Sequence, residues 1–75
     1  MIDPSDMSPA RWQARHAGLK AHGVPDDDDR IIECLAALAW WRVRRVVDRE
    51  RELLAPQHVD ALADMLKHAH QAVTA

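Results

Sequence analysis

Hydrophobic residues recur at helical spacing along three stretches of the chain. The clearest pattern, with alternating steps of three and four, lies near the C-terminus and comprises Val59, Leu62, Leu66, Ala69 and Val73. Such steps place the side chains on one face of a helix. Pro56 suits the first turn of that helix, because proline has no amide hydrogen to lose there. We therefore predict a helix over residues 56–72.

The first predicted helix, residues 9–22, has sequence signals at both ends. Ser8 can cap the free amides at its start, and Pro9 suits the first helical position. Gly23 fits the left-handed residue that closes a helix in a Schellman motif, with Val24 just beyond it. The stripe that we expect to be buried comprises Trp12, His16 and Leu19.

The second predicted helix, residues 26–54, begins at a run of four aspartates. Asp26 is the expected cap, and the carboxylates that follow it interact favourably with the positive end of a helix: Asp27, Asp28 and Asp29. Capping explains this run better than a calcium loop, and an acidic lure for a basic partner is the alternative. About 28 residues give a rod of roughly 42 Å. Pro56 ends it, so Ala55 is the predicted bend, either a tight corner or a kink.

The middle helix is apolar around much of its circumference. One stripe comprises Ile32, Leu35, Ala39, Val43 and Val46, and a second beside it comprises Ile31, Cys34, Leu38 and Trp41. The neighbouring helices span only about 21 and 25 Å, so they cannot cover the rod from end to end. A second copy is the simplest cover, since two-fold dimers are the commonest oligomers.

The sequence therefore predicts an all-α, three-helix chain with a long central helix that forms an antiparallel homodimeric bundle. The acidic start and the arginine-rich second half of that helix favour the antiparallel direction. The predicted dimer and core residues are Ile31, Ile32, Leu35, Leu38, Val43 and Val46. A monomeric bundle with Trp40 half exposed and an obligate complex with another protein are the alternatives.

Length and composition limit the classes of protein to which the chain can belong. We expect 75 residues to form one helical domain, 1–75, with residues 1–7 and 73–75 flexible. Cys34 is the single cysteine, which excludes an internal disulfide and fits burial in a reducing compartment. We see neither an export signal nor a membrane span, and so expect a cytoplasmic protein without membrane contact.

Arginines and tryptophans on the middle helix form the predicted partner-binding group, which comprises Trp40, Trp41, Arg42, Arg45 and Arg49. Arginine beside aromatic surface is enriched at protein interfaces and at phosphate-binding surfaces. The alternative is a solvated face whose arginines pair with Asp48. The net charge of −2 argues against general attraction to nucleic acid.

The sequence lacks the patterns of an enzyme or a metal protein. No motif sets a nucleophile beside a base, and Asp64 with His68 is the only sensible pair of metal ligands. We therefore predict a non-enzyme without metal or cofactor, a dimeric regulator or inhibitor of a larger protein of the accessory or phage and mobile-element type. A nucleic-acid binder using the arginines and a structural subunit of a larger assembly remain alternatives.

Overall fold

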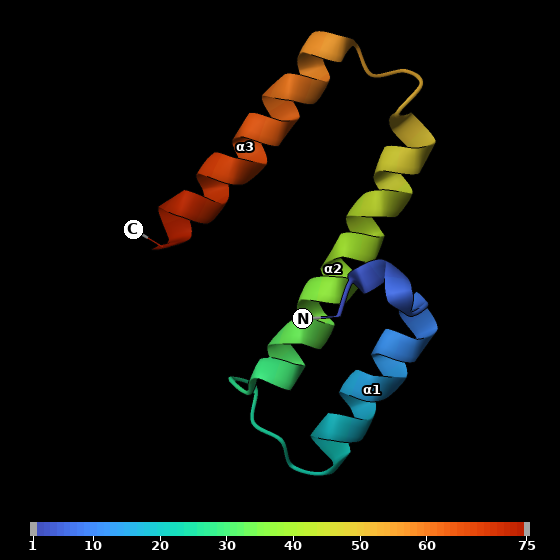
Figure 1. Ribbon diagram of the computed structural model, residues 1–75, viewed down its shortest axis with the longest axis vertical. Helices are drawn as coiled ribbons and strands as arrows, with labels where there is room; N and C mark the ends of the chain where they lie inside the picture. Colours follow the sequence, from blue (N-terminus) through green and yellow to red (C-terminus); the bar gives the residue numbers. More distant parts are fainter. Residues whose placement is uncertain (1, 75) are drawn as a thin grey trace.

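A computed structural model of the chain describes residues 2–74, with side chains described for residues 2–69. In chain order its elements are the short 3₁₀ turn η1 (Pro4–Asp6), α1 (Pro9–Ala21), α2 (Asp29–Glu50) and α3 (Pro56–Thr74). Across the described residues there is no strand, which confirms the all-α, three-helix prediction. Figure 1 shows α1 running antiparallel to the first half of α2, while α3 turns back at the other end of α2 and diverges from it.

The predicted start of α1 and the predicted end signals are confirmed, although the helix ends at Ala21, one residue before the predicted end. The Ser8 hydroxyl accepts a hydrogen bond from a backbone amide of the first turn at 3.3 Å. At the other end Gly23 has φ of 76°, in the left-handed region. The amide of Val24 donates to the Leu19 carbonyl at 3.1 Å, and the amide of Gly23 donates to the Lys20 carbonyl at 3.0 Å. These two bonds together define a Schellman motif.

The α2 helix begins later than predicted, because Asp28 and not Asp26 is its cap. The Asp28 amide donates to the Pro25 carbonyl at 3.0 Å, so residues 25–28 form a turn before the helix. The Asp28 carboxylate then accepts from the Arg30 amide at 2.8 Å. Asp26 pairs instead with Lys20 across the α1–α2 connection.

The α2 helix also ends earlier than predicted, so the long central rod over residues 26–54 is not what the chain forms. Its 22 residues span about 33 Å. The amides of Leu53 and Leu54 both turn back onto the Glu50 carbonyl, at 2.9 and 3.1 Å. The Ala55 carbonyl then accepts from the first amides of α3. The link is therefore a corner and not a kink, as Figure 1 shows.

The ends of the chain bear on the flexibility predicted for residues 1–7 and 73–75. The α3 helix continues to Thr74, two residues beyond the predicted end. Residues 1 and 75 lie outside the described residues. Flexibility of both ends stays a prediction.

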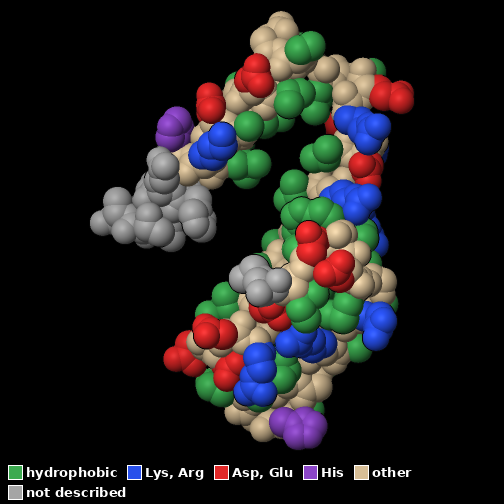
Figure 2. All heavy atoms as spheres, viewed as in Figure 1, with side chains coloured by type: hydrophobic (Ala, Val, Ile, Leu, Met, Phe, Trp, Pro, Cys, Tyr) green, Lys and Arg blue, Asp and Glu red, His purple; other side chains and the backbone are tan. Residues whose placement is uncertain are grey.

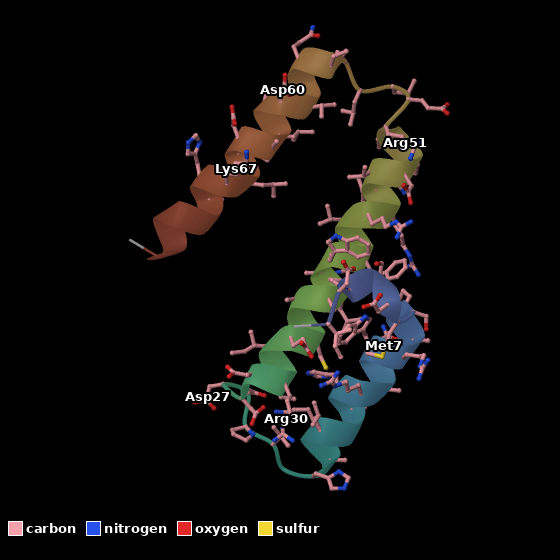
Figure 3. The ribbon with its side chains drawn as sticks, viewed as in Figure 1. Met7, Asp27, Arg30, Arg51, Asp60 and Lys67 are labelled. Carbon is pink, nitrogen blue, oxygen red and sulfur yellow. The ribbon has the colours of Figure 1, made fainter. Side chains whose placement is uncertain are left out.

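The core lies between α1 and the first half of α2. Its fully buried side chains are Trp12, Ile31, Cys34 and Ala37. Partly buried hydrophobic side chains pack around Trp12, Cys34 and Ala37: Met7, Leu19, Leu38 and Trp41. Met7 lies at the start of α1 beside α2 (Figure 3), where it packs on the cluster that contains Trp12, as expected of a hydrophobic staple.

Two indoles fasten the N-terminal turn to this core. The Nε1 atoms of Trp12 and Trp41 both donate to the Pro4 carbonyl, at 2.9 and 2.8 Å. Trp41 also donates to the Met7 carbonyl at 3.2 Å. Because a buried indole N–H needs an acceptor, the Pro4 carbonyl of η1 satisfies the polar atoms of both rings.

The α3 helix makes no comparable packing with α2. Packed helices have axes about 8–10 Å apart, which brings some of their Cα atoms well within 8 Å of each other. Among the described residues, no Cα of α3 lies that close to a Cα of α2. The radius of gyration is consequently 15.0 Å, against about 11 Å for a compact domain of this length.

Candidate protein-interaction surface

An apolar groove lies between the second half of α2 and α3. It has a volume of about 410 Å³ and is lined by Val43, Val46, Val47, Leu62, Met65 and Leu66, together with Arg42. We call these residues the α2–α3 groove. Figure 2 shows hydrophobic side chains along the inner side of both helices, and the acidic and histidine side chains of α3 on the side away from α2. The apolar face of α3 thus points toward α2 without reaching it.

The side chains of the groove are largely open to solvent. Leu62 is 41% exposed and Leu66 is 60% exposed, although both lie on the apolar face of α3. On α2, Val43 and Val46 are 51% and 48% exposed. A helical stripe of aliphatic residues is normally covered by another element, so this surface lacks its cover within the single chain.

The structure divides the predicted dimer and core residues into two sets. Ile31 is buried and Leu38 is partly buried against the α1–α2 core. The other four point away from that core and are each about half exposed: Ile32, Leu35, Val43 and Val46. These four form one continuous stripe along α2, which runs into the groove at its second half.

The accessible surface area of the whole chain indicates how much surface has no packing partner within the chain. The chain exposes 6076 Å². A compact protein of 8.5 kDa exposes about 4,700 Å², so the excess is about 1,400 Å². Since α1 and the first half of α2 are packed, most of this excess belongs to the second half of α2 and to α3.

The two neighbouring tryptophans have different surroundings. Their ring centroids are 5.2 Å apart at an interplanar angle of 87°, an edge-to-face pair. Trp41 is held beneath η1, whereas Trp40 is 38% exposed. The guanidinium of Arg44 lies over both rings, 5.3 Å from the centroid of Trp40 and 5.2 Å from that of Trp41. Arg44 also pairs with Asp48 at 3.6 Å, one of the local pairs that the sequence offered.

The predicted partner-binding group is not one surface. Residues two apart on a helix point to nearly opposite sides, so Trp40 and Arg42 lie on different flanks of α2. Arg49 pairs with Glu50 at 3.2 Å. For Arg42 and Arg45, no carboxylate among the side chains of residues 2–69 lies within ion-pair distance.

Arg42 and Arg45 border a second, smaller concavity where the start of α1 meets the middle of α2. This arginine hollow has a volume of about 210 Å³ and is lined by Pro9, Gln13, Leu38, Trp41, Arg42 and Arg45. Sequence reasoning missed Pro9 and Gln13, because they come from another helix and carry no local signal. Their separation of three residues does place Arg42 and Arg45 on one side of the helix.

The aspartates at the start of α2 serve partly as a helix cap. The Arg30 guanidinium and amide hold the pKa of Asp28 below its usual value of 3.8. A hydrogen bond from Lys20, together with its charge, lowers the pKa of Asp26. Asp27 is exposed at the turn (Figure 3), as is Asp29. An acidic lure stays a prediction.

Groups that could carry chemistry are few in the described part of the chain. Cys34 is fully buried, and burial raises the pKa of its thiol. Within residues 2–69, His, Cys, Asp and Glu side chains nowhere gather in threes as a metal site would require. Over the described residues, no helix is both long and apolar enough to cross a bilayer.

No protein family, curated protein or solved structure matches this chain. Its function must therefore be inferred from the geometry of its own surfaces.

Proposed function

We propose that the protein is a non-enzymatic helical binding module, a regulator or inhibitor of a larger protein, and that it works as an antiparallel homodimer. The observation that carries the proposal is the open α2–α3 groove. Three apolar side chains of α2 and three of α3 line it, and the two helices do not pack against each other to bury them. A surface of this kind stabilises a protein only when another polypeptide buries it.

A second copy fits the groove on chemical grounds. Both walls are apolar, and Arg42 is the one lining residue with a hydrogen-bonding side chain, so the matching surface must be mainly apolar too. The same chain supplies such a surface, and a two-fold axis sets it against itself. The excess of about 1,400 Å² per chain exceeds the roughly 800 Å² per partner that a standard interface buries.

Charge placement supports the antiparallel direction. Asp27 and Asp29 are exposed at the start of α2, whereas Arg44 and Arg49 are exposed in its second half. Antiparallel α2 helices bring these opposite charges together across the interface. Exposed pairs contribute only about 0–1 kcal/mol each, so they select direction more than they add affinity.

Sedimentation over a concentration series tests the dimer. We expect wild-type protein to approach twice the chain mass of 8.5 kDa as concentration rises. Leu62→Glu places a charge in the groove and is expected to leave a monomer. Leu53→Glu is the matched control, because Leu53 is 84% exposed and does not line the groove.

Two results contradict the homodimer. One is a wild-type mass of 8.5 kDa at every concentration. The other is equal dissociation by both glutamate variants, because that would mean that added negative charge and not the groove controls assembly. Far-ultraviolet circular dichroism on each variant separates lost assembly from lost folding.

A further inference from the structure

We infer that the arginine hollow binds an acidic segment of the partner protein, in which an Asp or Glu side chain neighbours an aliphatic one. The inference rests on the proposed function, because it names the chemistry of the larger protein that the module would bind. The lining of the site comes from the start of α1 and the middle of α2, helices that Figure 1 shows side by side, and includes no residue of α3.

The first argument is the unequal pairing of the arginines on α2. Three of them lie within 4.0 Å of a carboxylate of this chain, namely Arg30, Arg44 and Arg49, and so does Arg51 just beyond the helix. Arg42 and Arg45 have no such carboxylate among residues 2–69, and both are exposed. Three positions apart on the helix, they offer two guanidiniums at one place. A guanidinium binds a carboxylate through paired, charge-assisted hydrogen bonds.

The second argument is the mixed lining of the hollow. Leu38, Trp41 and Pro9 supply apolar surface next to the two charges, and Gln13 adds an amide. The indole N–H of Trp41 already donates to the Pro4 and Met7 carbonyls. Trp41 therefore presents only apolar ring surface to the hollow, and these bonds fix its position. A carboxylate beside an aliphatic group matches both parts of this lining.

The size of the hollow favours side chains of a peptide over a small-molecule ligand. Pockets for drug-sized molecules occupy about 300–1,000 Å³. The hollow, at about 210 Å³, accommodates one or two side chains. A docking protein segment would bring the remaining contacts from its own backbone and neighbours.

The charge pattern favours a protein carboxylate over nucleic acid. Nucleic-acid binding depends on several phosphate contacts along an extended positive surface. Here the net charge is −2, and carboxylates of this chain flank Arg44, Arg49 and Arg51. On α2, only the guanidiniums of Arg42 and Arg45 have no carboxylate of residues 2–69 within ion-pair distance, enough for one acidic group.

A titration followed by ¹⁵N nuclear magnetic resonance tests the inference. The probe is the peptide acetyl-Glu-Leu-Glu-Leu-Glu-Leu-amide at low salt, and its partner control replaces each Glu by Gln. We expect saturable shifts of the Trp41 indole N–H, with the Trp40 indole much less affected because it lies on the other flank. The Gln peptide should bind at least about tenfold more weakly, as expected for one lost charge-assisted hydrogen bond.

Two double variants of equal charge sharpen the test. Arg42→Gln/Arg45→Gln removes the guanidiniums of the hollow and should weaken binding by about tenfold or more. Arg49→Gln/Arg51→Gln removes the same charge from paired positions, and should change affinity by no more than about twofold. Circular dichroism confirms that each variant is folded.

Several results would overturn the inference. Equal losses in the two double variants would mean unspecific charge attraction, and equal binding of both peptides would mean apolar contact alone. Tighter binding of a single-stranded thymidine oligonucleotide than of the Glu peptide would assign the arginines to nucleic acid. Absence of Trp41 shifts would place the peptide elsewhere or nowhere. Sedimentation keeps the proposals apart, since an unaltered dimer without peptide binding refutes only the hollow.

Discussion

The two halves of this molecule have similar helical hydrophobic patterns and different packing. In the N-terminal half, α1 and η1 cover one face of α2 so completely that Trp12 and Ile31 are inaccessible to solvent. In the C-terminal half, α3 turns its aliphatic face toward α2 and leaves Leu62 and Leu66 open. The comparison shows that an amphipathic pattern predicts that a face needs cover and does not say whether the same chain provides it.

The physical difference lies in what each neighbour of α2 brings to the contact. The N-terminal half has large aromatic side chains, and the Pro4 carbonyl accepts hydrogen bonds from two indoles. An ion pair between Arg15 and Glu33 at 3.3 Å adds a further link between α1 and α2. The inner face of α3 has only aliphatic side chains, which pack without directional bonds. The corner at residues 51–55 then sets how far α3 diverges.

The largest expected effect comes from truncating the aromatic centre of the closed half. We expect Trp12→Ala to lower the free energy of unfolding by about 3–5 kcal/mol, because removal of the fully buried indole leaves a cavity and one of the two hydrogen bonds to the Pro4 carbonyl is lost. Trp40→Ala is the matched control, and its partly exposed ring should cost less than about 1 kcal/mol. Urea unfolding followed by circular dichroism measures both. Similar losses of unfolding free energy in the two variants would contradict the difference in packing between the halves.

Hydrogen exchange should separate the halves by their dependence on concentration. At concentrations about 100-fold above the dimer dissociation constant, partner binding adds about 2.7 kcal/mol, or about 100-fold slower exchange, to the amides that it protects. We expect this gain in α3 and the second half of α2, and little change in α1. Leu62→Glu should abolish the gain. Concentration-independent exchange in α3 would argue against a covering second copy.

Replacing each of the two glycines by alanine should change stability by a smaller amount. The two changes should have opposite signs, because one glycine lies inside α1 and the other at its end. Gly23 has φ of 76°, so Gly23→Ala should destabilise the protein by about 1 kcal/mol through left-handed strain. Gly18 lies inside the helix, and a Cβ added there would meet nothing within 4 Å. Gly18→Ala should therefore stabilise by about 0.5–1 kcal/mol. Thermal unfolding of both variants checks the signs, and a stabilising Gly23→Ala would contradict the Schellman assignment.

The smallest expected effect is the acid sensitivity of the turn before α2. Folding lowers the pKa of Asp26 and Asp28 below 3.8, because Lys20 and Arg30 favour their charged forms. The stabilisation from these carboxylates is therefore complete above pH 3.8 and is lost as pH falls through the lower folded-state pKa. Asp28→Asn keeps a capping oxygen, and its melting temperature should decrease less steeply than that of wild type as the pH is lowered. An acid transition as steep as that of wild type would show that Asp28 does not contribute to it.

Local signals in the sequence predicted the helix ends where a single residue type decides the geometry. Ser8, Pro9 and Gly23 each behave as expected, because a cap, a first-turn proline and a left-handed glycine depend on neighbours within a few residues. The start of α2 was misplaced because four consecutive aspartates are equally good caps. The choice among them depends on the turn to Pro25 and on Lys20 across the connection.

The candidate surfaces were predicted only in part, since they depend on contacts between helices. The pattern on residues 59–73 predicted an apolar face on α3, and the structure shows that face over residues 62–66 at the groove. Adjacent positions 40 and 41 look equivalent in sequence. The N-terminal turn makes one of them a structural anchor and leaves the other partly exposed, a distinction that no helical periodicity contains.

Because two indoles share the Pro4 carbonyl as their acceptor, tryptophan fluorescence reports on the position of the N-terminal turn. With no tyrosine and three tryptophans in the chain, nearly all of its near-ultraviolet emission comes from indoles, two of which bond to one carbonyl oxygen. Detachment of η1 would expose both rings to water and shift their emission to longer wavelengths. Trp40, whose ring lies beneath Arg44, serves as an internal reference. Intrinsic fluorescence can thus follow the docking of this three-residue turn on the core without any attached dye.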